Sequence, residues 1–273
     1  MSSSPSSELP APTETGFAGI ADHAIEFERY GGDASLPTIV LLHEGLGSVA
    51  MWRDFPAHLA SVIGTGVIAY SRRGYGASSP RAAAYEPDYM HREARETLPA
   101  LLDYWGLDRP VLVGHSDGAS IALIYGAEPQ CRAAGIAALA PHIFVEDISI
   151  ESISAAKEAF ATSDLADRLG RYHADVQHAF RGWNDGWLDP AFRDWNLEAL
   201  LPDIRCPVLA IQGEDDPYGT MAQIDGIERG ITAPFARLDL PGCGHSPHRE
   251  KPMETLAALA AFHRRIAEGA YAA

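Results

Sequence analysis

Val111-Leu112-Val113-Gly114-His115-Ser116-Asp117-Gly118-Ala119 is the stretch of this 273-residue chain that decides its fold. The apolar run before Gly114 is typical of a strand buried on both faces, and a helical run follows from Ala119. Ser116 therefore lies at the apex of a strand-to-helix turn, within a Gly-x-Ser-x-Gly pattern. Glycines at both ends let the flanking backbones approach closely, and the turn holds the serine hydroxyl at the positive N-terminal end of the helix. The alternative is an incidental serine in a glycine-rich turn, which the framing strand and helix disfavour.

Strands and helices alternate along most of the chain. Short apolar runs predict buried strands, and apolar residues at helical spacing predict the helices between them. The predicted strands span 23–30, 38–42, 66–70, 111–113, 136–139, 208–211 and 235–240, and the predicted helices 51–63, 91–105, 221–231 and 252–267. The first of these strands is expected at an edge. This order predicts an α/β fold with a mostly parallel, doubly wound sheet.

The alternation stops between about residues 143 and 200, where helical segments with three tryptophans replace the strand-like runs. We expect a small helical cap at 143–200, inserted after a central strand, and an α/β core formed by 17–142 and 201–273. Residues 1–16 contain no basic or apolar segment, so we expect a disordered N-terminal tail rather than a signal peptide.

Charge and cysteine content exclude several classes of function. The formal net charge is −16, with 21 basic residues against 37 acidic ones, whereas nucleic acids and anionic membranes need a basic surface. No apolar run approaches the length of a membrane-spanning helix. Cys131, Cys206 and Cys243 have no metal-site spacing, and their odd number suits a reducing compartment. We therefore expect a cytoplasmic protein, a monomer or homodimer, that binds a small molecule and neither nucleic acid nor membrane.

A serine hydroxyl needs a base to become a nucleophile, and the base needs an acid to orient it. Asp215 and Asp216 offer an acid after the predicted strand 208–211, and His245 offers a base after the last strand. The carboxyl ends of parallel strands meet at one edge of a sheet, so these groups can meet Ser116 despite their separation in sequence. The chain thus contains a candidate serine–acid–histidine set.

Five motifs in order give the chain a resemblance to the α/β-hydrolase superfamily from about residue 17 to residue 270. They are the His43–Gly47 loop, Arg73-Gly74-x-Gly76-x-Ser78, the Gly114–Gly118 turn, Gly213-x-x-Asp216 and Gly244-His245. Ser116-Asp117-Gly118 and the size of the insertion are similar to those of small esterases related to valacyclovir hydrolase. The resemblance implies the α/β-hydrolase fold with a helical cap.

The resemblance also implies a role for each residue. Ser116 would attack a carbonyl carbon, His245 would take the serine proton, and Asp216, at the family spacing, would hold His245. The backbone N–H groups of Gly45 and Asp117 would form an oxyanion hole, each worth roughly a hundred- to thousand-fold in rate. No metal or organic cofactor is needed.

The chain departs from the family pattern at two positions, and each departure adds or removes a carboxylate. The first loop has Glu44 where glycine is usual, and the turn after the next strand begins with Ser71 rather than aspartate. If Glu44 or Asp117 faces the pocket ionised, neutral or amine-bearing acyl groups are favoured over anionic ones. Alternatively, both carboxylates turn away and bond to backbone or to an arginine such as Arg73.

The cap is expected to cover Ser116 and to limit the size of the substrate, because apolar walls are what enclose small ligands. Its tryptophans are either part of the cap core or substrate contacts. We expect the substrate pocket to include Glu44, His142 and Trp187.

Other interpretations explain fewer of these features. A dinucleotide-binding site is one alternative, because the chain has Gly45-x-Gly47-x-x-Ala50 and carries Arg72-Arg73 after the next strand. However, Glu44 would repel the pyrophosphate of a dinucleotide. His245-x-x-His248 lacks further metal ligands, and Cys243 does not lie on a nucleophile turn. A non-catalytic ligand-binding protein on the same fold would leave the intact serine–acid–histidine set unexplained.

The sequence therefore predicts a serine hydrolase that cleaves a small carboxylic ester or related acyl compound through an acyl-enzyme on Ser116. Hydrolysis of a carbon–carbon bond in a meta-cleavage-type diketone uses the same residues and is the alternative chemistry. The fold alone does not choose between the two reactions.

Overall fold

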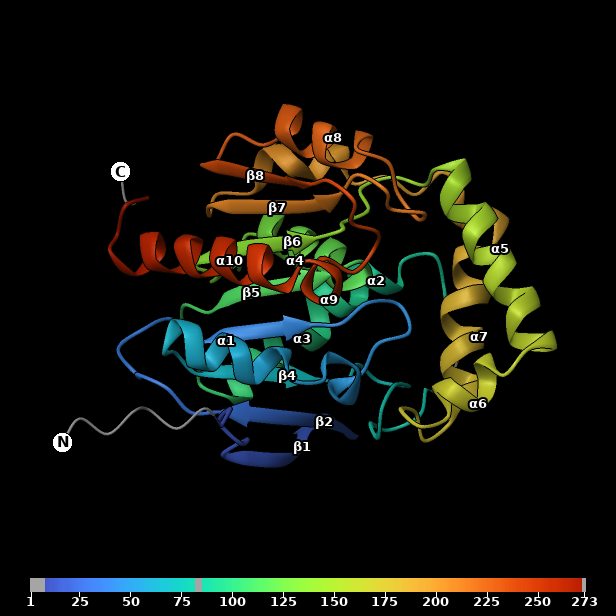
Figure 1. Ribbon diagram of the computed structural model, residues 1–273, viewed down its shortest axis with the longest axis horizontal. Coiled ribbons are helices and arrows are strands. Elements are labelled where there is room, and N and C mark those ends of the chain that lie inside the picture. The colour runs from blue at the N-terminus through green and yellow to red at the C-terminus, as the bar shows by residue number, and fades with distance from the viewer. Residues whose placement is uncertain (1–7, 82–84, 272–273) are drawn as a thin grey trace.

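An eight-stranded sheet forms the centre of the protein, whose computed structural model describes residues 8–81 and 85–271 (Figure 1). The strands are β1 (Glu14–Ile20), β2 (His23–Tyr30), β3 (Ile39–Leu42), β4 (Val67–Tyr70), β5 (Val111–His115), β6 (Gly135–Leu139), β7 (Val208–Gly213) and β8 (Phe235–Leu240). Their spatial order is β1-β2-β4-β3-β5-β6-β7-β8. β1 pairs antiparallel with β2, and β2 with β4, whereas the other neighbours are parallel. The predicted α/β fold with a mostly parallel sheet is confirmed.

The central strands are apolar on both sides because helices cover both faces of the sheet. Every residue of β3, β4, β5, β6 and β7 is buried. Alternate side chains of a strand point to opposite faces, and in β3 they enter two different cores. Ile39 and Leu41 belong to the core under α1 and α10, and Val40 and Leu42 to the core on the other face.

α1 and α10 pack together on one face of the sheet, and α2, α3, α4 and α8 lie on the other (Figure 1). The helices of the core are α1 (Phe55–Ile63), α2 (Tyr89–Arg92), α3 (Leu98–Tyr104), α4 (Asp117–Ala127), α8 (Ala222–Gly230), α9 (Pro247–Glu250) and α10 (Pro252–Ala267). α4 starts directly after the strand that leads to Ser116. Its N-terminus therefore lies at the carboxyl edge of the sheet.

The N-terminal part of the sheet differs from the prediction. β1 lies outside β2, so β2 is not the edge strand, and β1 begins at Glu14, before the boundary expected at residue 17. Ala18 is the buried residue of β1, and the other residues are exposed or partly exposed. A strand with so little buried surface leaves a weak apolar pattern. Residues 1–7 of the expected tail lie outside the described residues.

Two predicted helices are broken by their own prolines and turns. The stretch 51–63 begins as a 3₁₀ turn, Val49–Trp52, and α1 starts only at Phe55, with a proline in its first turn. The stretch 91–105 includes the end of α2, a π-helical turn at Glu93–Thr97 and then α3, which again carries proline at its start. Proline is tolerated in a first turn because its missing N–H is not needed there.

The segment 143–200 contributes α5 (Asp147–Thr162), α6 (Leu165–Leu169) and α7 (Val176–Trp187), which we call the inserted helices. They lie beyond the carboxyl ends of the strands (Figure 1). A bridge between Phe144 and Asn196 joins the two ends of the segment. The Phe160 and Phe180 rings stack with their centroids 3.8 Å apart, which packs α5 against α7.

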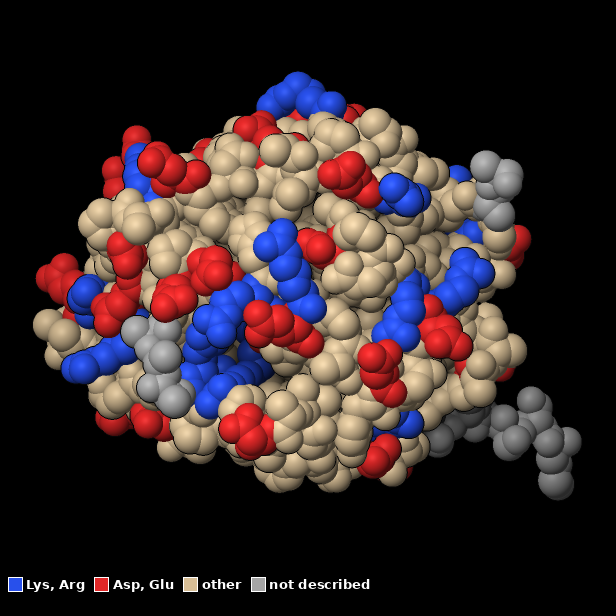
Figure 2. Space-filling model, turned by 180° about the vertical axis from the view of Figure 1, so that it is seen from behind, with Lys and Arg blue, Asp and Glu red and all other residues tan. Residues whose placement is uncertain are grey.

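Charged side chains of both signs are interspersed over the face that Figure 2 shows, although the formal net charge is −16. On the face opposite the view of Figure 1, several basic side chains gather round one hollow, with acidic groups beside them (Figure 2). Within residues 8–81 and 85–271, no helix has the length and apolarity that a membrane crossing requires.

Candidate active site

Ser116 lies on the strained turn that the glycine pattern predicts. Its backbone has a φ of 53°, a left-handed value that costs a non-glycine residue about 1–3 kcal/mol. A Cβ at Gly114 would overlap the Gly118 carbonyl, and a Cβ at Gly118 would overlap the Leu42 carbonyl. The Ser116 N–H donates to the carbonyl of Leu139 at 2.9 Å. The tight turn therefore requires glycine at both positions and presents the hydroxyl at the N-terminus of α4.

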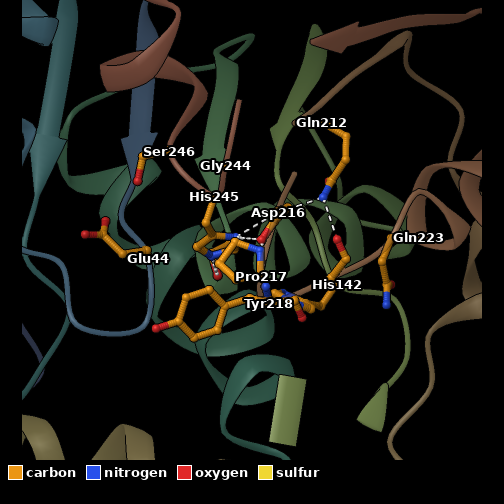
Figure 3. A network of polar contacts seen from close by, with 12 residues as sticks. Glu44, His142, Gln212, Asp216, Pro217, Tyr218, Gln223, Gly244, His245 and Ser246 are labelled. Carbon is orange, nitrogen blue, oxygen red and sulfur yellow. Dashed lines mark hydrogen bonds and ion pairs between the residues drawn. The ribbon is translucent and has the colours of Figure 1, made fainter. Parts of the chain in front are cut away.

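Ser116, His245 and Asp216 form one hydrogen-bonded chain. His245 Nδ1 lies 2.9 and 2.8 Å from the two carboxylate oxygens of Asp216 (Figure 3). Because a carboxylate accepts hydrogen bonds, Nδ1 carries the imidazole proton and Nε2 is left as an acceptor. His245 Nε2 lies 2.9 Å from Ser116 Oγ, so it can take the hydroxyl proton.

Of the two aspartates in the loop after β7, Asp216 is buried beside His245 and Asp215 is exposed. The backbone N–H of Tyr218 donates to Oδ1 of Asp216 at 2.8 Å, and Gln212 Nε2 donates to Oδ2 at 2.8 Å (Figure 3). Burial acts to raise the pKa of the Asp216 carboxyl. The hydrogen bond and charge of His245, with the Tyr218 N–H, outweigh burial and hold this pKa below its usual range. Asp216 thus stays ionised and keeps His245 in one tautomer.

A cavity of about 110 Å³ lies in front of the Ser116 hydroxyl. Its lining residues are Glu44, Gly45, Leu46, Ser116, Asp117, His142, Ile153, Trp183, Trp187, Tyr218 and His245. Trp183 and Trp187 come from α7, and Ile153 comes from α5, so the inserted helices provide one wall. The residues of both expected oxyanion donors, Gly45 and Asp117, border this cavity together with Ser116.

The three residues expected in the substrate pocket all border the cavity. His142 is buried between Trp187 and His245, with ring centroids 5.0 and 5.7 Å away. Its Nε2 donates to the Tyr218 carbonyl at 3.1 Å. Burial, together with the charge of His245, lowers the pKa of His142, so this ring is held neutral.

Asp117 is fully buried and has its own partners. The Tyr89 hydroxyl donates to Oδ2 at 2.6 Å, and Trp187 Nε1 donates to Oδ1 at 3.2 Å. A guanidinium nitrogen of Arg72 lies 3.7 Å from Oδ2. The arginine beside this carboxylate is therefore Arg72, and not the Arg73 suggested from the sequence, whose Nε donates to a backbone carbonyl instead. The charge of Asp117 is compensated inside the protein.

Glu44 directs its carboxylate away from the His245 ring (Figure 3). Oε2 lies 3.5 Å from Nδ1 of His115. Burial acts to raise the pKa of Glu44, but the contact with His115 and the charges of neighbouring histidines hold it well below its usual range. The backbone carbonyl of Glu44 accepts from His43 Nδ1 at 2.6 Å and from Arg72 at 3.0 Å. The loop with the unusual glutamate is thus fixed by its own neighbours.

The remaining sequence candidates have other surroundings. His248 is buried beside Trp52 and Phe55, with ring centroids 4.9 and 5.2 Å away. Over the described part of the chain, no group of three or more histidine, cysteine, aspartate or glutamate side chains is arranged to hold a metal ion. Burial raises the pKa of the Cys243 thiol to about 11, so this thiol is protonated at neutral pH.

Two side chains that the sequence analysis did not single out, His115 and Glu250, hold the loop of His245. His115 Nε2 lies 2.6 Å from the carbonyl oxygen of His245. The Glu250 carboxylate accepts from the N–H of Gly244 at 2.7 Å and from the N–H of Ser246 at 2.9 Å. Glu250 lies four residues after Ser246, one position beyond the spacing of a capping box, and the His115 contact has no local signature.

The chain is similar in sequence to known proteins. The sequence model of the alpha/beta hydrolase family matches residues 39–259. The chain is 24% identical over 276 residues to sn-1-specific diacylglycerol lipase ABHD11 of Mus musculus, covering 87% of this chain and 84% of that protein. It is 27% identical over 188 residues to serine hydrolase BPHL of Homo sapiens, covering 67% of this chain and 64% of that protein.

A similar fold is found among solved structures. A bacterial membrane phospholipase A superposes with a TM-score of 0.75 at 21% sequence identity, covering 93% of this chain and 86% of that one. At this level of identity the likeness supports the fold alone.

Proposed function

Because the chain belongs to the alpha/beta hydrolase family, we propose that it is a serine hydrolase that cleaves a small carboxylic ester through an acyl-enzyme on Ser116. That it is a hydrolase follows from the family and from relatives that include a lipase and a serine hydrolase. The observation that carries the finer proposal is the chain of contacts from Asp216 through His245 to Ser116, with the serine on a strained turn facing a cavity.

The reaction has two halves. Ser116 Oγ attacks the carbonyl carbon while its proton passes to His245 Nε2, and the bond from that carbon to the leaving oxygen breaks as the proton is returned to the leaving group. Water then attacks the acyl carbon and gives a proton to His245, and the bond to Ser116 Oγ breaks as His245 passes that proton to Oγ, which releases the acid and restores the serine hydroxyl. Asp216 keeps the imidazole oriented through both halves.

Charge that develops on the carbonyl oxygen needs donors that are already in place. We assign this role to the backbone N–H groups of Gly45 and Asp117, which belong to residues on the cavity wall. The Asp117 amide also belongs to the first turn of α4, where the helix dipole favours negative charge. Loss of one such donor typically costs roughly a hundred- to thousand-fold in rate.

The size and chemistry of the cavity favour a short, uncharged acyl group. About 110 Å³ is small, and Leu46, Ile153, Trp183 and Trp187 make much of its wall apolar. Of the two alternatives that the sequence left open for Asp117, its contact with Arg72 favours the carboxylate paired within the protein over one that attracts an ammonium group. We therefore propose neutral acyl groups as substrates, in preference to amine-bearing or anionic ones.

The direct test is to label the protein with a fluorophosphonate and to assay a panel of esters, lactones, thioesters, amides and meta-cleavage-type diketones. We expect labelling of Ser116, turnover of short-chain esters, and loss of both in Ser116→Ala. Turnover of diketones without turnover of esters would replace the proposal by carbon–carbon bond hydrolysis. Binding of an ester without labelling or turnover would point to a non-catalytic binding protein.

A further inference from the structure

His115 connects the nucleophile strand to the base. It is the last residue of β5, directly before Ser116, and its side chain is buried. Its Nε2 lies 2.6 Å from the carbonyl oxygen of His245. Since a carbonyl only accepts hydrogen bonds, Nε2 carries a proton and donates it. The contact therefore acts on the backbone of His245, at the residue whose ring reaches both Ser116 and Asp216.

Glu44 faces the other nitrogen of the same ring. Its Oε2 lies 3.5 Å from His115 Nδ1, which has no hydrogen-bond partner among the described residues. The rings of Trp52 and His248 lie close to His115, with centroids 6.4 and 4.8 Å away. Because a carboxylate only accepts hydrogen bonds, it attracts this ring when Nδ1 carries a proton as well, and it then holds the imidazole with Nε2–H directed at the His245 carbonyl.

The rest of the His245 backbone is held from the opposite side. The Glu250 carboxylate accepts hydrogen bonds from the backbone N–H groups of Gly244 and Ser246, which flank His245. These two contacts satisfy the N–H groups before and after the base, but a carboxylate has no hydrogen to donate to the His245 carbonyl. His115 supplies the contact that Glu250 cannot make.

We propose that His115 and Glu44 are positioning residues for His245, an inference that rests on the serine hydrolase function proposed above. His115 fixes the carbonyl of His245 through its Nε2–H, and Glu44 fixes the His115 ring. Neither side chain exchanges a proton with the substrate. A displacement of about 1 Å at a reacting group can cost on the order of a hundred-fold in rate, so this support acts on kcat.

The first test compares two buried histidines that make the same type of contact. His115→Leu removes the donor to the His245 carbonyl. His263→Leu is the matched control, because His263 is buried and its Nε2 lies 2.7 Å from the Pro37 carbonyl, away from the cavity. We expect His115→Leu to lower kcat on a short ester by roughly ten- to a hundred-fold with KM little changed. His263→Leu should leave kcat unchanged, and His115→Gln, whose amide nitrogen reaches about as far as Nε2, should recover part of the loss.

The second test asks whether Glu44 acts through His115. We expect Glu44→Ala to lower kcat, but less than His115→Leu does, and the double variant to be no worse than His115→Leu alone. Glu214→Ala is the control for charge, since Glu214 is an exposed carboxylate on the loop of Asp216. Additive losses in the double variant would overturn the part assigned to Glu44.

A spectroscopic readout separates this proposal from the proposed function. The Nδ1–H proton of His245, which faces Asp216, gives an NMR resonance that responds to the geometry of that contact. We expect it to shift or broaden in His115→Leu and not in His263→Leu, whether or not the tested esters are substrates. An unlabelled, inactive wild type would defeat the hydrolase proposal alone. An unchanged resonance with unchanged kcat in His115→Leu, or equal loss in both leucine variants, would overturn the positioning role.

Discussion

Trp187 donates its indole N–H to the carboxylate of Asp117 at 3.2 Å, and this hydrogen bond ties the inserted helices to the residue directly after the candidate nucleophile. Trp187 is the last residue of α7, and Asp117 is the first residue of α4. The tryptophan is also part of the cavity wall, with 1% of its surface exposed. One side chain therefore limits the space for the acyl group and supports the turn behind it.

Replacing Trp187 by a smaller residue should change the acyl chain length that the protein prefers in its ester substrates. Trp187→Ala opens space beside Ser116, so we expect longer acyl esters to gain relative to acetate esters in kcat/KM. Trp187→Phe keeps most of the bulk but leaves Asp117 without one donor, which costs roughly 1–3 kcal/mol of stability. Its chain-length preference should stay close to that of the wild type. Loss of turnover by the same factor on every ester in Trp187→Ala would mean that the residue is only structural.

Because the charge of Asp117 is compensated by Arg72, an ammonium group on the substrate should not raise the rate of hydrolysis. We expect wild type to hydrolyse an ester that bears an ammonium group no better than its uncharged isostere, at low and at high salt. Asp117→Ala should cost roughly 3–5 kcal/mol of unfolding free energy, because it leaves the buried Arg72 without its carboxylate. Asp117→Asn keeps an acceptor for the Tyr89 hydroxyl, so it replaces the alanine variant in the rate comparison if that variant does not fold. A wild-type preference for the ammonium ester that Asp117→Asn abolishes would contradict the prediction.

Two single substitutions, at Asp215 and at Asp216, can identify which aspartate orients His245. Asp216→Asn should lower kcat on the order of 10⁴-fold, because an amide can impose the wrong tautomer on His245. Asp215→Asn should have little effect, since Asp215 is exposed. Steady-state rates on one short ester decide the matter, and a reversed order of the two variants would show that the wrong aspartate had been assigned.

Buried histidines should make the fold sensitive to mild acid. Burial is the largest cause of a lowered pKa for each of His43, His142, His173, His248 and His263. Because these rings have pKa values near 6.5 when unfolded, their contribution to stability is fully present above that pH and is lost as pH falls through the lower folded values. Burial also lowers the pKa of the partly exposed His91, so the raised pKa of buried Glu93 acts in the opposite direction as one group against six.

Urea unfolding measured between pH 7.5 and pH 5 should therefore show a free energy of unfolding that decreases as the pH falls. His263→Phe removes one of these rings far from the cavity, so its slope should be shallower than that of the wild type. A free energy that stays constant or rises across this range would contradict the prediction.

The sequence alone determined the frame of the site. Gly114, Ser116 and Gly118 predicted the strained turn because that turn has no room for a Cβ at either glycine position. The alternation of apolar strands and helices predicted a mostly parallel sheet, and the common edge of such a sheet brought Asp216 and His245 to Ser116. These are local patterns combined with one general rule of topology.

The tertiary structure decided what surrounds that frame. Asp117 is neutralised by Arg72 and held by Tyr89 and Trp187, which come from three separate parts of the chain. The His115 side chain contacts the carbonyl of His245, a residue 130 positions away, and no spacing in the sequence predicts that contact. Whether a buried carboxylate faces a ligand or an arginine depends on which segments pack beside it, and that follows from the burial of the whole chain rather than from any one motif.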